Sequence, residues 1–141
     1  MRKSDLDLQA KQMLKAAKLY CTKCRVAVVT VLLKSRSPKT CQQIAKCLSN
    51  MRFNKVSIYR TLASLLEVGL VHRAFMQERA WYFELAKDCS ESQCHPHFTC
   101  TNCGDTHCLT EMALPMAKSP HNGFVIRRQQ VRLEGLCPKC A

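Results

Sequence analysis

CSESQCHPHFTCTNCGDTHC, residues 89–108, packs five cysteines and three histidines into twenty residues. No apolar core needs such a run. The chain contains two Cys-x-x-Cys motifs, or knuckles: Cys100-x-x-Cys103 and, further along, Cys137-x-x-Cys140. Two knuckles separated in this way are the spacing of a closed, tetrahedral four-cysteine zinc site. The sequence therefore predicts a structural zinc ion on these four thiolates, with two buried thiol pairs or a redox disulfide as the alternatives.

The same stretch holds more soft and borderline ligands than one zinc ion can use, which suggests a second metal site. His95 and His97 flank Pro96, so on an extended strand both imidazoles point to one face and could share an ion. The remaining thiols of the stretch are Cys89, Cys94 and Cys108.

Length and composition limit what this metal-rich stretch can be attached to. The 141 residues suffice for one ordinary domain, or for two small ones supported by a metal or a partner subunit. The sequence has no apolar segment typical of a signal peptide and none long enough to span a bilayer, so we expect a cytoplasmic protein that does not contact membranes. In a reducing compartment, paired cysteines at metal spacing favour thiolate ligands over disulfides.

The positive charge of the chain is concentrated in its first part. Residues 1–86 carry 16 Lys and Arg against 5 Asp and Glu, an excess of 11, whereas residues 87–141 carry 6 against 5. A basic first part joined to a nearly neutral, metal-rich second part suggests that the first contacts a polyanion. A merely soluble basic surface is the alternative.

Four helices are predicted in the basic part. Residues 4–19 form an amphipathic pattern with a basic face, and Thr22 can cap a second helix that is apolar on all sides and ends before residues 35–38. Thr40 can cap a third helix over residues 41–49. Asn54 can cap a fourth that begins at Lys55.

The last two helices fit a helix-turn-helix whose second helix enters the major groove of DNA. Apolar residues recur in that helix at helical spacing and leave a polar outer face: the first set is Val56, Tyr59, Leu62, Leu65 and Leu66, and the second is Lys55, Ser57, Arg60, Thr61 and Ser64. Residues 70–75 and 80–85 then alternate with period two around a polar turn at residues 76–79, which predicts a hairpin. A helix-turn-helix followed by a hairpin is a winged helix.

Five segments, in order along the chain, resemble the ferric uptake regulator superfamily. They are SIYRTL at residues 57–62, GLV at 69–71, YFEL at 82–85, HPHFTCTNCG at 95–104, and the region from Gly123-Phe124 to LEGLCPKC at 133–140. Within the superfamily, the sequence is most similar to the zinc uptake regulators. The resemblance implies an α/β (α+β) architecture: a winged-helix DNA-binding domain over residues 1–86, and a small α/β dimerisation domain with the four-cysteine zinc over residues 87–141.

The resemblance also implies a function. A member of this kind is a dimeric, metal-dependent transcriptional repressor that binds palindromic operator DNA when zinc occupies a regulatory site at the hinge, and so controls zinc uptake genes. Its expected partners are double-stranded operator DNA and a second copy of the chain, with no small-molecule substrate. Iron or peroxide sensing within the same superfamily, or thiol-based redox sensing, are the alternatives.

The regulatory site of the family draws on the first strand of the wing, the hinge and a His-x-His pair. By position, these correspond to His72, Cys89, His95 and His97. Cys108 falls where a zinc-binding relative would place a glutamate ligand, so it is the substitute for one of the four. A thiolate with three imidazoles suits zinc better than ferrous iron, which favours carboxylates.

A further metal site of many relatives falls here on Cys94, Pro96 and Gln129, and Pro96 offers no side-chain ligand. We therefore expect two zinc ions per chain, one structural and one regulatory. For DNA, Tyr59 and Arg60 are the candidates for base contacts, and Lys15, Lys18 and Lys55 for phosphate contacts, with Ser57 on the same outer face.

An enzyme is disfavoured by the same motifs. A zinc-dependent deaminase needs a Glu two residues after its His and a Pro directly before its Cys-x-x-Cys. Here His97 stands two residues after His95, and Pro138 lies inside the second knuckle. Four protein ligands also close the position that a catalytic zinc keeps open.

Three interpretations remain open for Cys21-x-x-Cys24, which the family pattern does not account for. The two cysteines are either small residues that flank a helix, a thiol switch or a third metal site. Cys41 and Cys47 are predicted to be ordinary buried thiols.

Overall fold

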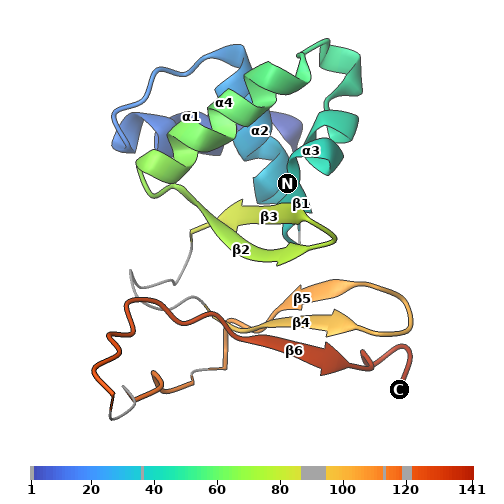
Figure 1. The fold of residues 1–141 in the computed structure, drawn as a ribbon. Helices are drawn as coiled ribbons and strands as arrows, with labels where there is room; N and C mark the ends of the chain where they lie inside the picture. Colours follow the sequence, from blue (N-terminus) through green and yellow to red (C-terminus); the bar gives the residue numbers. More distant parts are fainter. Residues whose placement is uncertain (1, 36, 87–94, 113, 119–121) are drawn as a thin grey trace. The chain divides into compact units, whose positions relative to one another are not determined.

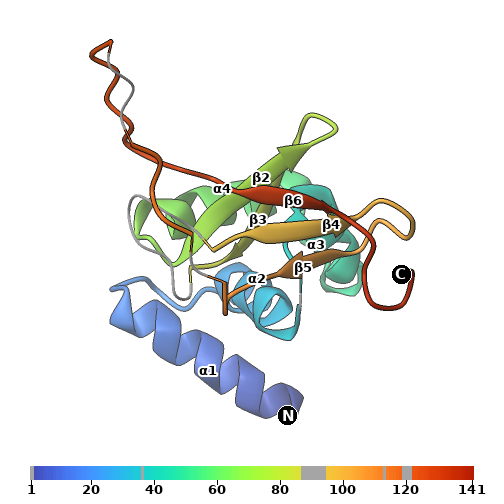
Figure 2. The ribbon, with the colours of Figure 1, turned by 90° about the horizontal axis from the view of Figure 1, so that it is seen from below.

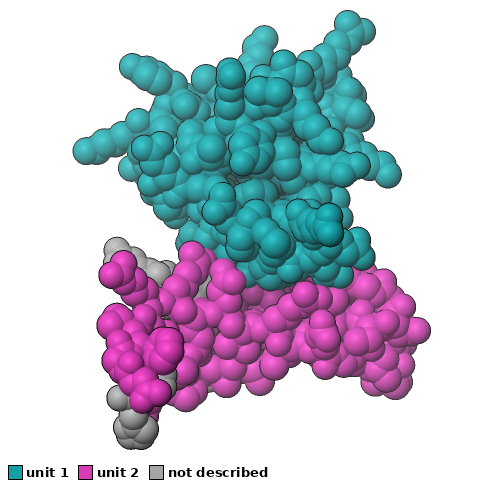
Figure 3. Space-filling view, in the orientation of Figure 1, with its two compact units in different colours: residues 1–86 teal, residues 87–141 magenta. Residues whose placement is uncertain are grey.

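The computed structural model describes residues 2–35, 37–86, 95–112, 114–118 and 122–141. The chain divides into two compact units, unit 1 over residues 1–86 and unit 2 over residues 87–141 (Figure 3). Among the described residues, no helix has the length and apolar character needed to cross a membrane.

Unit 1 is a helical bundle closed by a small sheet (Figure 1). Its elements are α1 (Lys3–Ala16), α2 (Lys23–Lys34), β1 (Lys39–Thr40), α3 (Cys41–Cys47), the short 3₁₀ helix η1 (Ser49–Met51), α4 (Lys55–Glu67), β2 (Val71–Gln77) and β3 (Ala80–Leu85). The three strands are antiparallel in the order β1-β3-β2. This is the predicted helix-turn-helix followed by a wing hairpin.

Three polar side chains fix where the helices begin, as the sequence predicts. Thr22 accepts a hydrogen bond from the Arg25 amide, Thr40 from the Gln43 amide, and Asn54 from the Ser57 amide. Each bond satisfies one of the amides that a first helical turn leaves without an intrahelical partner. α1 is shorter than predicted: it ends at Ala16, and Lys18 follows in the left-handed conformation (φ 58°).

The apolar core of unit 1 lies where α2 and α4 meet the sheet. Val28, Ile44, Ile58, Leu65 and Val71 are all fully buried, and Phe83 covers them from the sheet. The same core cluster takes in Ala10 and Leu14 of α1, which lies beside α2 (Figures 1 and 2).

The exposed and buried residues of α4 differ from those that the spacing of apolar residues predicts. Val56 and Tyr59 are 56% and 60% exposed, whereas Thr61 is buried. The core side of the helix is Ile58, Thr61, Leu62 and Leu65, an i, i+3, i+4, i+7 pattern. The prediction that Thr61 lies on the outer face is wrong, because a hydroxyl-bearing side chain is classed as polar although its position belongs to the buried register.

Unit 2 is built on a three-stranded sheet of β4 (His97–Cys100), β5 (Thr106–Cys108) and β6 (Arg132–Gly135), in the order β5-β4-β6. β4 runs antiparallel to β5 and parallel to β6. The described parts of the long connection from β5 to β6 leave the sheet and return to it (Figure 2). Among its described residues this unit contains no helix, so the helices of the mixed fold lie in unit 1.

Candidate metal centres

The four cysteines of the two knuckles come together at one end of the sheet of unit 2. Cys100 ends β4 opposite Gly135 of the parallel strand β6, so both strands deliver their knuckles to the same edge. Tight turns close each knuckle, with the Gly104 amide bonded to the Cys100 carbonyl and the Cys140 amide to that of Cys137. Gly104 has φ 76°, a conformation that side chains with a Cβ rarely adopt.

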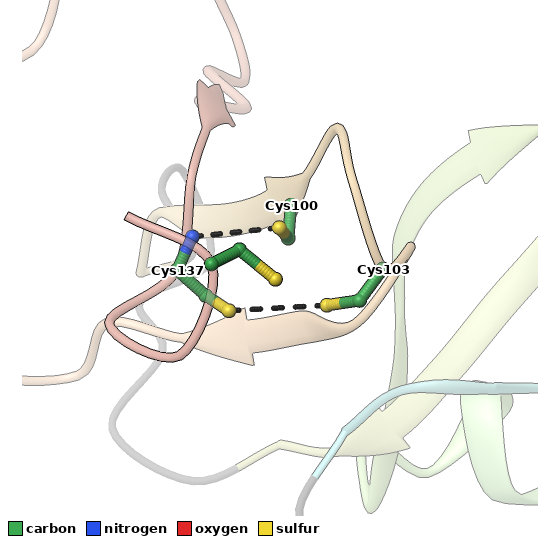
Figure 4. A group of neighbouring side chains, drawn as sticks. Cys100, Cys103 and Cys137 are labelled. Atoms are coloured by element: carbon green, nitrogen blue, oxygen red, sulfur yellow. Dashed lines mark hydrogen bonds between the residues drawn. The ribbon is translucent and has the colours of Figure 1, made fainter.

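The sulfur atoms have the spacing of a metal cage. All four lie within 4.8 Å of one another, and those of Cys103 and Cys137 are 3.8 Å apart. A tetrahedral zinc ion with bonds of about 2.3 Å holds its sulfur ligands about 3.8 Å apart. In Figure 4 the thiols of Cys100, Cys103 and Cys137 point toward a common centre. The four residues therefore fit a tetrahedral metal ion such as zinc.

The electrostatics of this group also favour a cation. Backbone amides of Cys103 and Cys137 lower the pKa of the Cys100 thiol to about 6, so it is a thiolate at neutral pH. The Asp105 amide acts in the same direction on Cys103, but the neighbouring thiol of Cys100 and burial outweigh it and raise its pKa to about 12. A second thiolate beside the first is unfavourable unless a positive ion compensates both charges.

A second candidate group in unit 2 consists of His95, His97 and Cys108. The ligand atoms of these three residues lie within 4.8 Å of one another. His97 on β4 stands directly opposite Cys108 on β5, and the rings of His95 and His97 are 4.6 Å apart between centroids. The Leu109 amide donates to the Pro96 carbonyl at 2.9 Å, which fixes the chain on both sides of the group.

His72 lies in unit 1, on β2, opposite Glu84 of β3. Its Nε2 is 2.6 Å from the Glu84 carboxylate. Glu84 is a potential metal ligand that the sequence analysis did not single out. It lies in the YFEL segment, and only the hairpin register, which sets it opposite His72, identifies its carboxylate as a candidate ligand.

The two remaining cysteines of the stretch, Cys89 and Cys94, lie outside the described residues, so the assignment of Cys89 to the regulatory site stays a prediction. Gln129, at a position where the resemblance implies a histidine ligand, bridges a loop: its side-chain oxygen accepts from the Ala117 amide at 2.6 Å and its nitrogen donates to the Pro115 carbonyl at 3.0 Å.

The candidate DNA-contacting residues lie on the surface of unit 1. Lys15, Lys18, Lys55 and Arg60 are exposed, as is Tyr59, and Ser57 is half-buried at the start of α4. A pocket of about 890 Å³ lies between α3, α4 and the wing hairpin. Its lining includes one acidic residue, Glu78, and four basic ones, Lys46, Lys55, Arg73 and Arg79. Arg73 also stacks over Trp81 at 5.1 Å.

Known proteins resemble the chain in sequence. The model of the Ferric uptake regulator family matches residues 16–132. The transcriptional regulator FurA of Mycobacterium tuberculosis, and that of Mycobacterium bovis, is 29% identical over 91 residues. That alignment covers 62% of this chain and 59% of FurA, so it spans less than two thirds of these relatives.

Solved structures resemble it in fold. A zinc uptake regulator complexed with zinc and DNA superposes with a TM-score of 0.64 at 20% identity, over 99% of this chain and 95% of that one. The ferric uptake regulator of Helicobacter pylori, described as having three functional metal binding sites, gives 0.61 at 18% identity, over 99% and 94%. At these sequence identities the superpositions support the fold alone. The match to the family model establishes the family relationship. The chain belongs to the ferric uptake regulator family.

Proposed function

We propose that this protein is a metal-dependent transcriptional repressor that binds palindromic operator DNA as a homodimer when zinc occupies a regulatory site, and that it controls zinc uptake genes. Family membership supports a regulator over an enzyme. The observation that carries the proposal is that the two units hold different features. Unit 1 has a basic helix-turn-helix with an exposed α4 face, and unit 2 has two groups of candidate metal ligands. A cytoplasmic location is part of the proposal.

The two ligand groups have different tasks. Four thiolates saturate a tetrahedral ion, so the four-cysteine group is the structural zinc site. His95, His97 and Cys108 leave one position for a further ligand, so this group is the regulatory site. Cys108 is preferred to Cys89 as the thiolate because it stands opposite His97 in the sheet.

The fourth regulatory ligand comes from the wing. The His72 Nε2 atom and the Glu84 carboxylate are 2.6 Å apart, so a metal ion bound by one of these side chains would lie close to the other. In the regulatory site that the family resemblance implies, zinc would be held by His72 of the wing together with His95, His97 and Cys108. Without it, few conformers of a dimer hold two recognition helices about 34 Å apart, one turn of DNA. The preference of the ion for the DNA-binding arrangement is the coupling free energy, and DNA must tighten metal binding in return.

DNA contacts follow from the surface of unit 1. Tyr59 and Arg60 project from α4 toward base edges, and Lys15, Lys18 and Lys55 neutralise phosphates. The basic pocket beside α4 adds Lys46, Arg73 and Arg79 to the phosphate-binding set. Dimerisation is supported by apolar side chains exposed in unit 2: Phe124 is 64% exposed and Val125 78%.

Iron sensing is the second candidate, and Glu84 is the observation that favours it, because a carboxylate suits a harder ion than zinc. To separate the two, protein stripped of its labile metal is given zinc or, without oxygen, ferrous iron. Each sample then selects duplexes from a random-sequence pool. We expect zinc at nanomolar free concentration to restore selective binding. Restoration by ferrous iron alone would replace zinc by iron in the proposal.

A further inference from the structure

Cys21 and Cys24 take no part in the proposed function, yet they sit at a junction of three helices in unit 1. Cys21 is the middle residue of a tight turn closed by the Thr22 amide and the Tyr20 carbonyl at 3.0 Å. Thr22 is the N-cap of α2, which places Cys24 in its first turn. Both thiols are half-buried and pack against the core of the unit.

Each sulfur is bonded to a different neighbouring helix. The Cys21 thiol donates to the Lys11 carbonyl of α1 at 3.6 Å. The Cys24 sulfur accepts from the Thr61 hydroxyl of α4 at 3.3 Å. Thr61 is only 8% exposed, so water has little access to replace this bond. The dithiol therefore connects the start of α2 to both α1 and α4.

We propose that Cys21 and Cys24 form a reversible disulfide, a modification site for peroxides that is separate from both metal centres and that loosens α4 when oxidised. A peroxide breaks its O–O bond on one thiolate, which becomes a sulfenic acid as the first water or alcohol leaves. The second thiol then attacks that sulfur, the S–S bond forms, and the hydroxyl departs as water. Two sulfur atoms are oxidised by one electron each, and the peroxide is reduced by two.

The bonds to the other helices cannot survive this reaction unchanged. A disulfide carries no S–H, so Cys21 can no longer donate to the Lys11 carbonyl. An S–S bond of about 2.05 Å also fixes where the Cys24 sulfur points. The sulfur then turns from Thr61, whose buried hydroxyl loses its acceptor. Because α4 carries Tyr59 and Arg60, its loosening weakens DNA binding, a consequence that rests on the proposed function.

The first test is independent of DNA. Zinc-loaded, full-length protein is equilibrated in glutathione buffers or treated with hydrogen peroxide, its free thiols are blocked, and the peptides are identified by mass spectrometry. Trypsin cleaves after Lys23, so a disulfide appears as two peptides joined through Cys21 and Cys24. We expect this linkage in a single transition. Cys21 and Cys24 remaining thiols, or carrying only single glutathione adducts, while the exposed Cys47 is oxidised would overturn the proposal.

Two threonine variants test the link to α4. Thr61→Val removes the hydroxyl that favours the reduced pair, so the equilibrium should move about fivefold toward the disulfide, the scale of one hydrogen bond. Thr30→Val is the matched control, since its buried hydroxyl donates a hydrogen bond to the Asp7 carboxylate of the same unit instead of to a sulfur. Equal shifts in the two variants would contradict the link. In wild-type protein, α4 amides should exchange with deuterium faster after oxidation, and unchanged exchange would also contradict it.

The last arm measures affinity for DNA selected from a random pool. Peroxide should weaken binding by wild-type protein and by Cys47→Ser, but not by Cys21→Ser/Cys24→Ser with its zinc intact. If the reduced protein binds no DNA, the proposed regulator function fails while the disulfide tests stand. If peroxide weakens the double variant equally, the four-cysteine zinc is the sensitive site and the disulfide has no regulatory role.

Discussion

Cys108 is the residue on which the regulatory site depends most. In the proposed site it would supply the thiolate, since it stands opposite His97 in the sheet, and two imidazoles alone would leave a zinc ion without a thiolate ligand. Cys108→Ser should leave the protein folded with its structural zinc, and should weaken the second, labile zinc at least about tenfold, or about 1.4 kcal/mol. A competition titration with a zinc-binding dye measures this directly.

Cys47→Ser is the control for that substitution, because Cys47, which the sequence wrongly predicts to be buried, is an exposed thiol in unit 1. Cys89→Ser completes the comparison. If Cys89→Ser weakens the labile zinc and Cys108→Ser does not, the site exists but its thiolate has been assigned to the wrong residue.

Cys100 gives the metal-free protein a pH signature. Its folded-state pKa of about 6 lies below the ordinary value of 9.0, so the thiolate stabilises the folded unit. That contribution is complete above pH 9 and is lost as the pH falls through 6. Thiolate absorbance of stripped protein should therefore show a titration near pH 6 that is missing in Cys100→Ser. A first titration only near pH 9 would contradict the role of the Cys103 and Cys137 amides.

At single positions, the sequence predicts what spacing alone determines. The four-cysteine group is of this kind, because two knuckles and a metal-like separation suffice to define it. Glu84 is of the other kind, since only the hairpin register sets it opposite His72. Thr61 is a residue of the second kind too, because a threonine is polar by type and only its place in the helical register shows that it is buried.

Among the secondary-structure elements, the wing hairpin stores removable strain. Glu78 and Arg79 form its two-residue turn with φ of 50° and 63°, values that favour Asn-Gly. Glu78→Asn/Arg79→Gly should raise the free energy of unfolding by about 1 kcal/mol, measured by chemical denaturation. DNA affinity should fall in the double variant only, because Glu78→Asn alone keeps the Arg79 charge. Unchanged stability would mean that the turn is not strained.

Helix boundaries were predicted well where a cap defines them. Thr22, Thr40 and Asn54 begin α2, α3 and α4 as expected, because a side-chain acceptor for a first-turn amide is a local property. The end of α1 was not predicted correctly, since the left-handed residue after it is Lys18 and not the glycine that usually marks a helix end. The strands of unit 2 were also hard to predict, because β4 and β6 pair across about thirty residues of intervening chain.

For the whole molecule, the concentration of charge in unit 1 predicts how DNA binding responds to salt. If its lysines and arginines displace counterions, log affinity must fall with log salt with a slope of several units. Arg60→Ala should weaken binding more on selected than on random duplexes, whereas Lys46→Ala should weaken both alike. Fluorescence anisotropy across a salt series measures both effects. A slope near zero would refute the polyanion assignment of residues 1–86.

Occupancy of the regulatory site is proposed to switch the affinity of the protein for DNA. The most direct measurement is the affinity of the protein, with its structural zinc retained, for a selected duplex across buffered free zinc concentrations. We predict that this affinity rises at least about tenfold as the second zinc binds, and that the rise is absent in His97→Ala and Cys108→Ser. If the second zinc binds wild-type protein while its affinity for the duplex stays constant, the chain is not a zinc-switched repressor.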